Sequence, residues 1–230
     1  MSPVHSTDLL FTPTEDRNAI KVDVPSKRLY FSIYYYTKDD AFKRASQTKE
    51  REIKGRSDWK PARDTFVAIE VRTEADFRAA WASVMKQAKD EGYVVAEGHL
   101  FTHASKPKGG RGGLEFAAIP GTGDGTITRE EVSQLAKLPW QKAGELILYG
   151  CNTGRAGEGR SWTPAQAFAD AQGVKTSGTT GYAYFSTSRD KHVKITDSST
   201  EVYLHPYKWG KNGYFGDGEA MPDKIFTPAK

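Results

Sequence analysis

The sequence predicts an α/β fold built around a mainly parallel sheet. Between residues 65 and 176, short segments rich in aliphatic, β-branched and aromatic residues alternate with segments of helical periodicity. Of the 230 residues, 37% are hydrophobic and 12% are aromatic, which is enough for one sizeable core. Strand–helix–strand alternation of this kind gives parallel strands joined by right-handed crossovers. We therefore expect a single α/β domain over residues 28–207, between an N-terminal arm (1–27) and a C-terminal tail (208–230).

The first quarter of the chain contains one clear strand signal. Residues 1–27 are polar and include three prolines, so they are expected to form an arm lying on the surface. The segment LYFSIYYYT, residues 29–37, is typical of a strand. Residues 38–64 contain nine basic and six acidic residues and few apolar ones, which predicts a solvated charged insertion. A nucleic-acid-binding patch is the alternative, and the mixed signs of charge disfavour it.

The remaining elements follow from strand composition and from helix-capping residues. The expected strands are Phe66–Val71, Tyr93–Phe101, a short arm at Leu114–Ile119, Glu145–Tyr149, Val174–Thr176, Tyr182–Ser186 and Val202–Leu204. One helix is expected between a Thr73 cap and Gly92, one after the capping box that begins at Thr128, and one from Pro164 to Gln172. Residues 106–113 (KPKGGRGG) predict a mobile basic loop exposed to proteolysis, and the tail is expected to cover a sheet edge.

Composition excludes several classes of protein and site. The single cysteine excludes an internal disulfide framework and cysteine-rich metal sites, and we expect no cofactor. No run approaches the roughly 18 apolar residues of a membrane span. The start lacks the pattern of a Sec signal peptide, so synthesis in the cytoplasm is expected. The net charge of +4 permits a nucleic-acid partner without arguing for one.

Two strand ends bear the candidate chemistry. Residues 93–101 lead into His103, and residues 145–149 lead into Cys151, which lies between Gly150 and Asn152. Neighbouring parallel strands would bring both residues to the same edge of the sheet, where binding sites form. A thiol and an imidazole are the minimum equipment for nucleophilic acyl transfer, and backbone N–H groups of Gly150 and Asn152 could hold an oxyanion. The alternative is a buried structural cysteine and a satisfied surface histidine.

His99 is the second candidate histidine. His99, Phe101 and His103 lie on one face of the expected strand, and an earlier strand end would favour His99. We favour His103 because it is nearer the loop. The two histidines would lie roughly 13 Å apart along a strand, which is too far for joint zinc ligation. No metal site is therefore expected.

The segments VVAEGHLFTHAS and LILYGCNTG resemble the caspase-like cysteine peptidases, the group of caspases, gingipains, clostripain, separase and the CHAT peptidases. The resemblance covers residues 65–188. It implies a caspase–hemoglobinase fold, a three-layer αβα sandwich, with His103 as general acid or base and Cys151 as nucleophile. That family usually has glycine after the histidine. This chain has Ala104, which still offers an N–H to the oxyanion.

The same resemblance implies where a substrate pocket lies. In that family, the region after the next strand helps to line the pocket, which points to Ser177, Gly178 and Tyr184. Cleavage after arginine or lysine needs an acid in the pocket, for which Asp190 and Asp197 are the candidates. The alternative is a tight turn that leads into an edge strand.

The expected function is therefore a cysteine endopeptidase acting on a protein or peptide. By analogy, it is a bacterial effector or toxin exported by a dedicated secretion system, with a cognate inhibitor or immunity protein as partner. One alternative is a non-catalytic protein-binding module on the same fold. A basic nucleic-acid-acting toxin ranks last, because the sequence lacks a carboxylate-rich metal cluster. A catalytic Cys151 should be partly exposed with a depressed pKa, whereas an inert one should be buried.

Overall fold

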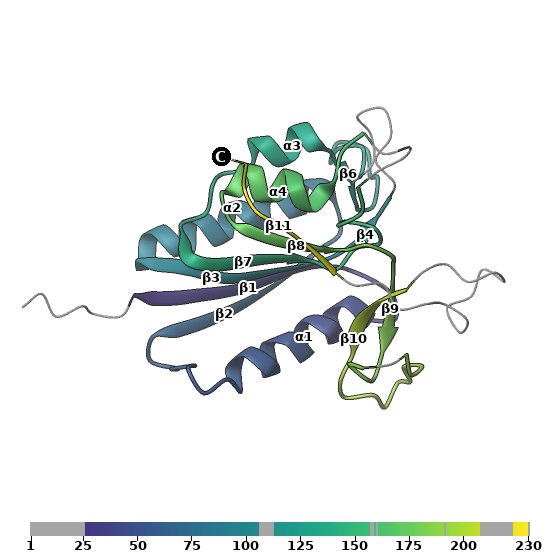
Figure 1. Ribbon diagram of the computed structural model, residues 1–230, viewed down its shortest axis with the longest axis horizontal. Coiled ribbons are helices and arrows are strands. Elements are labelled where there is room, and N and C mark those ends of the chain that lie inside the picture. Colours follow the sequence, from purple (N-terminus) through teal and green to yellow (C-terminus); the bar gives the residue numbers. More distant parts are fainter. Residues whose placement is uncertain are drawn as a thin grey trace, which may run out of the picture.

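A six-stranded sheet forms the centre of the computed structural model, which describes residues 26–105, 113–156, 159, 161–190, 192–207 and 223–229 (Figure 1). The strand order is β11-β8-β7-β3-β1-β2, and every neighbouring pair is parallel except β11 with β8. The elements are β1 (Lys27–Tyr35), α1 (Ala41–Lys54), β2 (Asp64–Val71), α2 (Glu74–Glu91), β3 (Tyr93–Phe101), β4 (His103–Ala104), β5 (Leu114–Glu115), β6 (Thr126–Ile127), α3 (Arg129–Gln134), β7 (Trp140–Leu148), α4 (Pro164–Gln172), β8 (Lys175–Thr179), β9 (Tyr182–Ser186), β10 (Tyr203–Tyr207) and β11 (Asp223–Phe226). The predicted α/β class with a mainly parallel sheet is confirmed.

Helices cover both faces of the sheet. Figure 1 shows α1 on one face and α2, α3 and α4 on the other. Alternate side chains of β1 serve the two layers: the ring of Phe31 packs against Trp81 of α2, and the hydroxyl of Ser32 lies 2.5 Å from that of Ser46 on α1. The chain crosses from β1 to β2 and then returns past β1 to β3, so the strand order reverses between β1 and β3. Ligands of open α/β sheets bind at the carboxyl ends of the strands beside such a reversal.

The predicted charged insertion is wrong, because most of residues 38–64 forms helix α1. Its buried face combines four apolar side chains with two buried hydroxyl groups; the apolar ones are Ala41, Phe42, Ala45 and Ile53. One of the hydroxyl groups is that of Ser46. The other, Thr48, accepts a hydrogen bond from the N–H of Val202 at 2.9 Å. Charged residues on the outer face hide this thin apolar stripe in the sequence.

Helix boundaries agree with the predicted capping signals. Thr73 and Thr128 each form a capping box at the start of α2 and α3, and Pro164 is the first residue of α4. Gly92 ends α2 in the left-handed conformation, with a φ of 70°, which costs glycine little. Strand β7 starts five residues earlier than predicted, at Trp140.

The C-terminal strand β11 pairs with β8 and forms one edge of the sheet, as expected for the tail. Most of the predicted N-terminal arm (residues 1–25), residues 106–112 of the predicted basic loop and residues 208–222 of the tail lie outside the described residues. Among the helices that the structure describes, none has the length and apolar composition of a membrane span.

Candidate active site

The two candidate segments meet at the carboxyl edge of the sheet. Strands β3 and β7 are parallel neighbours, as predicted, with Leu100 opposite Leu148. A Cβ atom placed on Gly150 would lie 2.8 Å from the Cβ of Ala104 and 3.1 Å from the carbonyl oxygen of Thr102. Glycine at position 150 therefore lets the segment that bears Cys151 pack directly against the segment that bears His103.

His103 lies in β4, and its side chain is exposed. The imidazole packs edge-on against the rings of Phe42 and Tyr35, with centroids 5.1 and 5.7 Å away. Within the described part of the chain, no hydrogen bond joins His103 to Cys151. In this structure the two segments are in contact, but the imidazole packs against aromatic rings and is not hydrogen-bonded to the thiol.

The Cys151 side chain is half-buried. Its sulfur accepts a hydrogen bond from the N–H of Ala183 in β9, at 3.3 Å. Burial raises the pKa of the thiol; the Ala183 N–H acts in the opposite direction, and the nearby charge of Glu115 raises the pKa further. A raised pKa is the property expected of an inert cysteine and not of a catalytic one, and the thiol holds its proton at neutral pH in this state of the protein.

The backbone around Cys151 is fixed by the neighbouring strand. Asn152 adopts a left-handed conformation with a φ of 56°, and its N–H donates to the carbonyl of Gly181 at 2.7 Å. In this state of the protein the Asn152 N–H, predicted to help hold an oxyanion, is therefore occupied by a backbone acceptor. The Gly150 N–H, by contrast, meets no acceptor among the described residues.

Ladder geometry directs the N–H of Ala104 away from β5. The N–H of Ser105 donates to the carbonyl of Gly113 at 3.0 Å, so Ser105 and Gly113 are a hydrogen-bonded pair. Hydrogen-bonded and non-hydrogen-bonded pairs alternate in an antiparallel ladder, so His103 and Glu115 are the next hydrogen-bonded pair. Ala104 opposes Leu114 as a non-hydrogen-bonded pair between them. Its N–H therefore points to the other side of β4 and remains free of the β5 strand.

Of the predicted pocket residues, only Tyr184 lies near Cys151. Burial raises the pKa of Tyr184, and the charge of the Cys151 thiolate raises it further. Ser177 is buried in β8, and a Cβ atom on Gly178 would lie 2.7 Å from the backbone nitrogen of Gly154. Gly178 therefore packs against the loop that follows Cys151, whereas Ser177 pairs with Ile147 and Ile225 inside the sheet. Asp190 lies in the exposed loop after β9, and Asp197 is exposed in the turn that follows.

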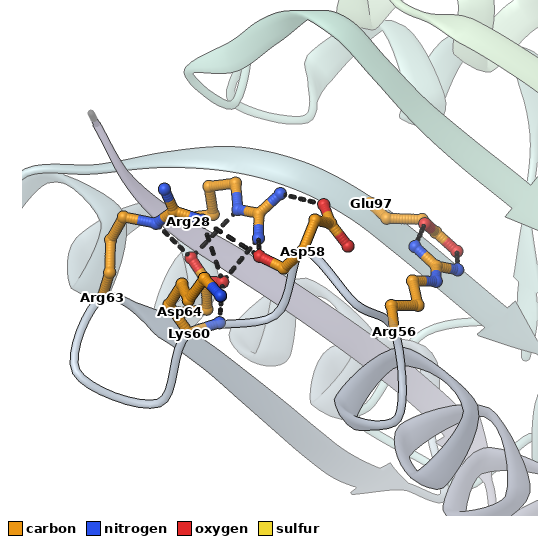
Figure 2. Close-up of polar contacts among 7 residues, drawn as sticks. All are labelled: Arg28, Arg56, Asp58, Lys60, Arg63, Asp64 and Glu97. Atoms are coloured by element: carbon orange, nitrogen blue, oxygen red, sulfur yellow. Dashed lines mark hydrogen bonds and ion pairs between the residues drawn. The ribbon is translucent and has the colours of Figure 1, made fainter.

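His99 lies inside β3 and is fully buried. Its Nδ1 is 3.2 Å from the hydroxyl of Tyr149, and its Nε2 lies 3.0 Å from a carboxylate oxygen of Glu97 without the geometry of a hydrogen bond. Glu97 also binds the guanidinium of Arg56 through two contacts, at 2.6 and 3.0 Å (Figure 2). Burial lowers the pKa of His99, so a neutral imidazole is held in the interior, away from the edge where His103 lies.

The structure adds residues that the sequence analysis missed. A shallow cavity of about 250 Å³ beside His103 is lined by two carboxylates and two aromatic rings, those of Glu115, Asp124, Tyr35 and Phe116. The predicted hairpin arm at residues 114–119 could have pointed to this cavity. A strand that pairs with the segment of His103 places Glu115 opposite the imidazole. Among the described residues, no group of three or more histidine, cysteine or acidic side chains is arranged to hold a metal.

Comparison with protein-family models, curated proteins and solved structures finds no match to this chain in any of the three.

Proposed function

We propose that this protein is a cysteine endopeptidase that hydrolyses peptide bonds with Cys151 as nucleophile and His103 as general acid and base, on a caspase-like αβα sandwich. One observation supports this most: a thiol and an exposed imidazole follow the carboxyl ends of adjacent parallel strands, on segments in direct contact. The absence of a hydrogen bond between the imidazole and the thiol is compatible with this proposal, because such hydrogen bonds are often long or misaligned before substrate binds.

The proposed reaction uses groups of these two segments. His103 takes the thiol proton as the sulfur attacks the substrate carbonyl, and the N–H groups of Ala104 and Gly150 bind the resulting oxyanion. The imidazolium then gives its proton to the leaving amine, which leaves a thioester on Cys151. Water, deprotonated by His103, hydrolyses the thioester and restores the thiol. Because burial raises the pKa of the thiol, Cys151 is protonated in the free protein, and the transfer of its proton to His103 accompanies the attack on the carbonyl.

The substrate is proposed to be a protein or peptide with a basic side chain near the cleaved bond. The cavity beside His103 presents the carboxylates of Glu115 and Asp124, with the rings of Tyr35 and Phe116 as walls. Carboxylates and aromatic faces together suit a lysine or arginine side chain. These two acids take the place of Asp190, which lies in an exposed loop.

The second candidate is a non-catalytic protein-binding module on the same fold. It is favoured by the raised pKa of Cys151 and by the Ala183 N–H that already occupies its sulfur. An effector or toxin with an inhibitor partner is the biological setting we propose for the peptidase. That setting rests on the family resemblance alone.

Two measurements on the full chain separate these functions. The first is hydrolysis of a quenched fluorescent peptide library with arginine, lysine, aspartate or leucine at the cleaved position. The second is alkylation of Cys151 by iodoacetamide, followed by mass spectrometry. A peptidase hydrolyses basic peptides and loses activity in proportion to alkylation. Absence of hydrolysis, together with alkylation slower than that of free cysteine, would leave the binding module as the better account.

A further inference from the structure

A second cavity, of about 310 Å³, lies on the α1 side of the sheet, at the carboxyl ends of β3 and β7. Its walls are one face of α1, the strand β10 and the first residue of β11. Figure 1 shows the β9–β10 pair lying beside the end of α1 next to this edge of the sheet. The volume is at the lower end of the range for small-molecule sites, roughly 300–1,000 Å³. No step of the proposed peptide hydrolysis uses this cavity.

The floor of the cavity is aromatic. Phe101 and Tyr149 stack with their centroids 4.4 Å apart and their rings 4° from parallel. The Tyr149 hydroxyl is engaged with His99 beneath, so the pair offers rings rather than polar atoms. Aliphatic side chains from α1 and β10, Ala45 and Leu204, complete the apolar surface. Such a lining accommodates an apolar body of a few carbon atoms.

The charged groups of the cavity fall into two sets. At one end, Glu52 binds both Lys49, at 2.6 Å, and Arg189, so its charge is fully compensated. At the other end, Asp223 makes no hydrogen bond and no ion pair within the part of the chain that the structure describes. The imidazole of His205 lies nearby, and its Nε2 contacts the carbonyl of Ser188. Asp223 belongs to the exposed part of β11, so its carboxylate is open to an incoming cation, and partial desolvation of the carboxyl by the neighbouring cavity wall raises its pKa.

We propose that this cavity binds a small organic cation, an ammonium or guanidinium group on an apolar body, with the cation at Asp223 and the body over Phe101 and Tyr149. A cation supplies the partner that the Asp223 carboxylate lacks, and a charge-assisted hydrogen bond of this kind is stronger than a neutral one. The aromatic floor adds apolar contact area for the body of the ligand. Either a free amine or a basic side chain of a peptide carries this chemistry.

The test is calorimetric titration of the full chain with 2-phenylethylamine, and separately with its anionic isostere 3-phenylpropionate. The amine should bind and the acid should not. Asp223→Asn, which keeps the side-chain shape, should weaken amine binding roughly tenfold or more. Asp90→Asn, an exposed change on α2, is the matched control and should leave binding unchanged. N-acetyl-arginine methylamide tests the peptide source, and binding stronger than that of the amine, weakened likewise by Asp223→Asn, would assign the site to peptides.

Three results would overturn the proposal. They are absence of amine binding at millimolar concentrations, acid binding as strong as amine binding, and amine binding that Asp223→Asn leaves intact. Equal melting temperatures of Asp223→Asn and wild type establish that the variant is folded. The comparison of the two probes on the wild-type protein needs no variant. Because the readout is binding, the outcome is independent of peptidase activity.

Discussion

Charged side chains are paired at the amino edge of the sheet, whereas candidate functional side chains at its carboxyl edge are not, within the described part of the chain. At the amino edge, Arg28 binds Asp58 at 2.6 Å and Asp64 at 2.5 Å, and Asp64 also accepts hydrogen bonds from Arg63 and from the backbone of Lys60 (Figure 2). At the carboxyl edge, His103 makes no hydrogen bond to a described residue, and the Asp223 carboxylate has no ion pair there.

This difference separates groups that hold the fold from groups that can act on a ligand. Buried polar groups are normally hydrogen-bonded, and those left without partners at a cavity are the ones a ligand can satisfy. Asp64 is 3% exposed and its neighbours use its oxygens fully, so it has nothing to offer a ligand. His103 and Asp223 are both exposed at the carboxyl edge, where an incoming molecule can reach them.

The largest expected effect is on catalysis at the carboxyl edge. Cys151→Ser and His103→Ala should each lower peptidase activity by orders of magnitude, because a serine hydroxyl is a far weaker nucleophile than a thiolate and the dyad acts as a unit. The measurement is the hydrolysis rate of a basic peptide, with a thermal melt of each variant. Stability should change by no more than about 1–2 kcal/mol in Cys151→Ser.

His99→Ala is the control for the choice of histidine. If His103 is the catalytic one, folded His99→Ala protein should retain much more activity than His103→Ala. Equal losses in the two folded variants would contradict that choice. A folded Cys151→Ser protein with wild-type activity would exclude thiol catalysis.

The second largest effect is on stability at the amino edge. Asp64→Ala leaves the Arg28 guanidinium, which is 15% exposed, beside a buried gap, and breaking such a pair costs about 3–5 kcal/mol. The Asp58 side chain, the other partner of Arg28, is 59% exposed. Asp58→Ala should therefore cost about 1 kcal/mol or less. Urea unfolding of both variants gives the difference. Equal costs would show that burial does not distinguish the two acids.

Acid should weaken the amino edge more than the carboxyl edge. Burial alone would raise the pKa of Asp64 and of Glu97, but the guanidinium groups of Arg28 and Arg63 at Asp64, and the His99 imidazole and Arg56 guanidinium at Glu97, hold both pKa values well below their ordinary range. Their stabilisation is therefore present above the unfolded pKa of about 4 and is lost as pH falls below it. The pKa of Asp223 is raised in the folded protein, so its contribution to the free energy of unfolding falls as pH rises.

Urea unfolding at pH 7, 5, 4 and 3 checks this dependence. The free energy of unfolding should fall steeply below pH 4, and Asp64→Asn should make the fall shallower than in wild type. Asp223→Asn should leave the steep fall in place. A free energy of unfolding that stays constant from pH 5 to pH 3 would show that these ion pairs contribute no net stability.

The smallest effect is expected on the surface of α2. Lys86 pairs with Asp90 one helical turn away, and both side chains are mostly exposed. Solvent screens such pairs, so Lys86→Ala should leave the melting temperature unchanged within error. A clear loss of stability would mean that exposed pairs matter here as much as the enclosed pair of Arg28 and Asp64.

Local signals in the sequence predicted most of the fold. The capping residues Thr73, Thr128 and Pro164 placed three helices, and the composition of residues 93–101 placed β3 at its observed limits. Helix α1 was missed because its buried face depends on the hydroxyls of Ser46 and Thr48, which look like surface residues until partners from other segments are known.

Contacts between distant segments explain what the sequence could not predict at the candidate site. Strand ends predicted that His103 and Cys151 would share an edge. The Ala183 hydrogen bond to the cysteine sulfur and the burial that raises its pKa arise from packing of β9 onto the loop. Asp223 joins Phe101 and Tyr149 only through the pairing of β11 with β8.

The central position of β1 also bears on the speed of folding. This strand has β2 on one side and β3 on the other, so Lys27 cannot meet Tyr93 until two helices and a strand have been looped out between them. Closing such long loops costs entropy before any contact returns it, and folds dominated by distant pairings fold more slowly than helical bundles. We expect a rate-limiting step in which β1, β2 and β3 assemble around Phe31. Substitutions there should slow refolding, while changes in β11 should mainly speed unfolding.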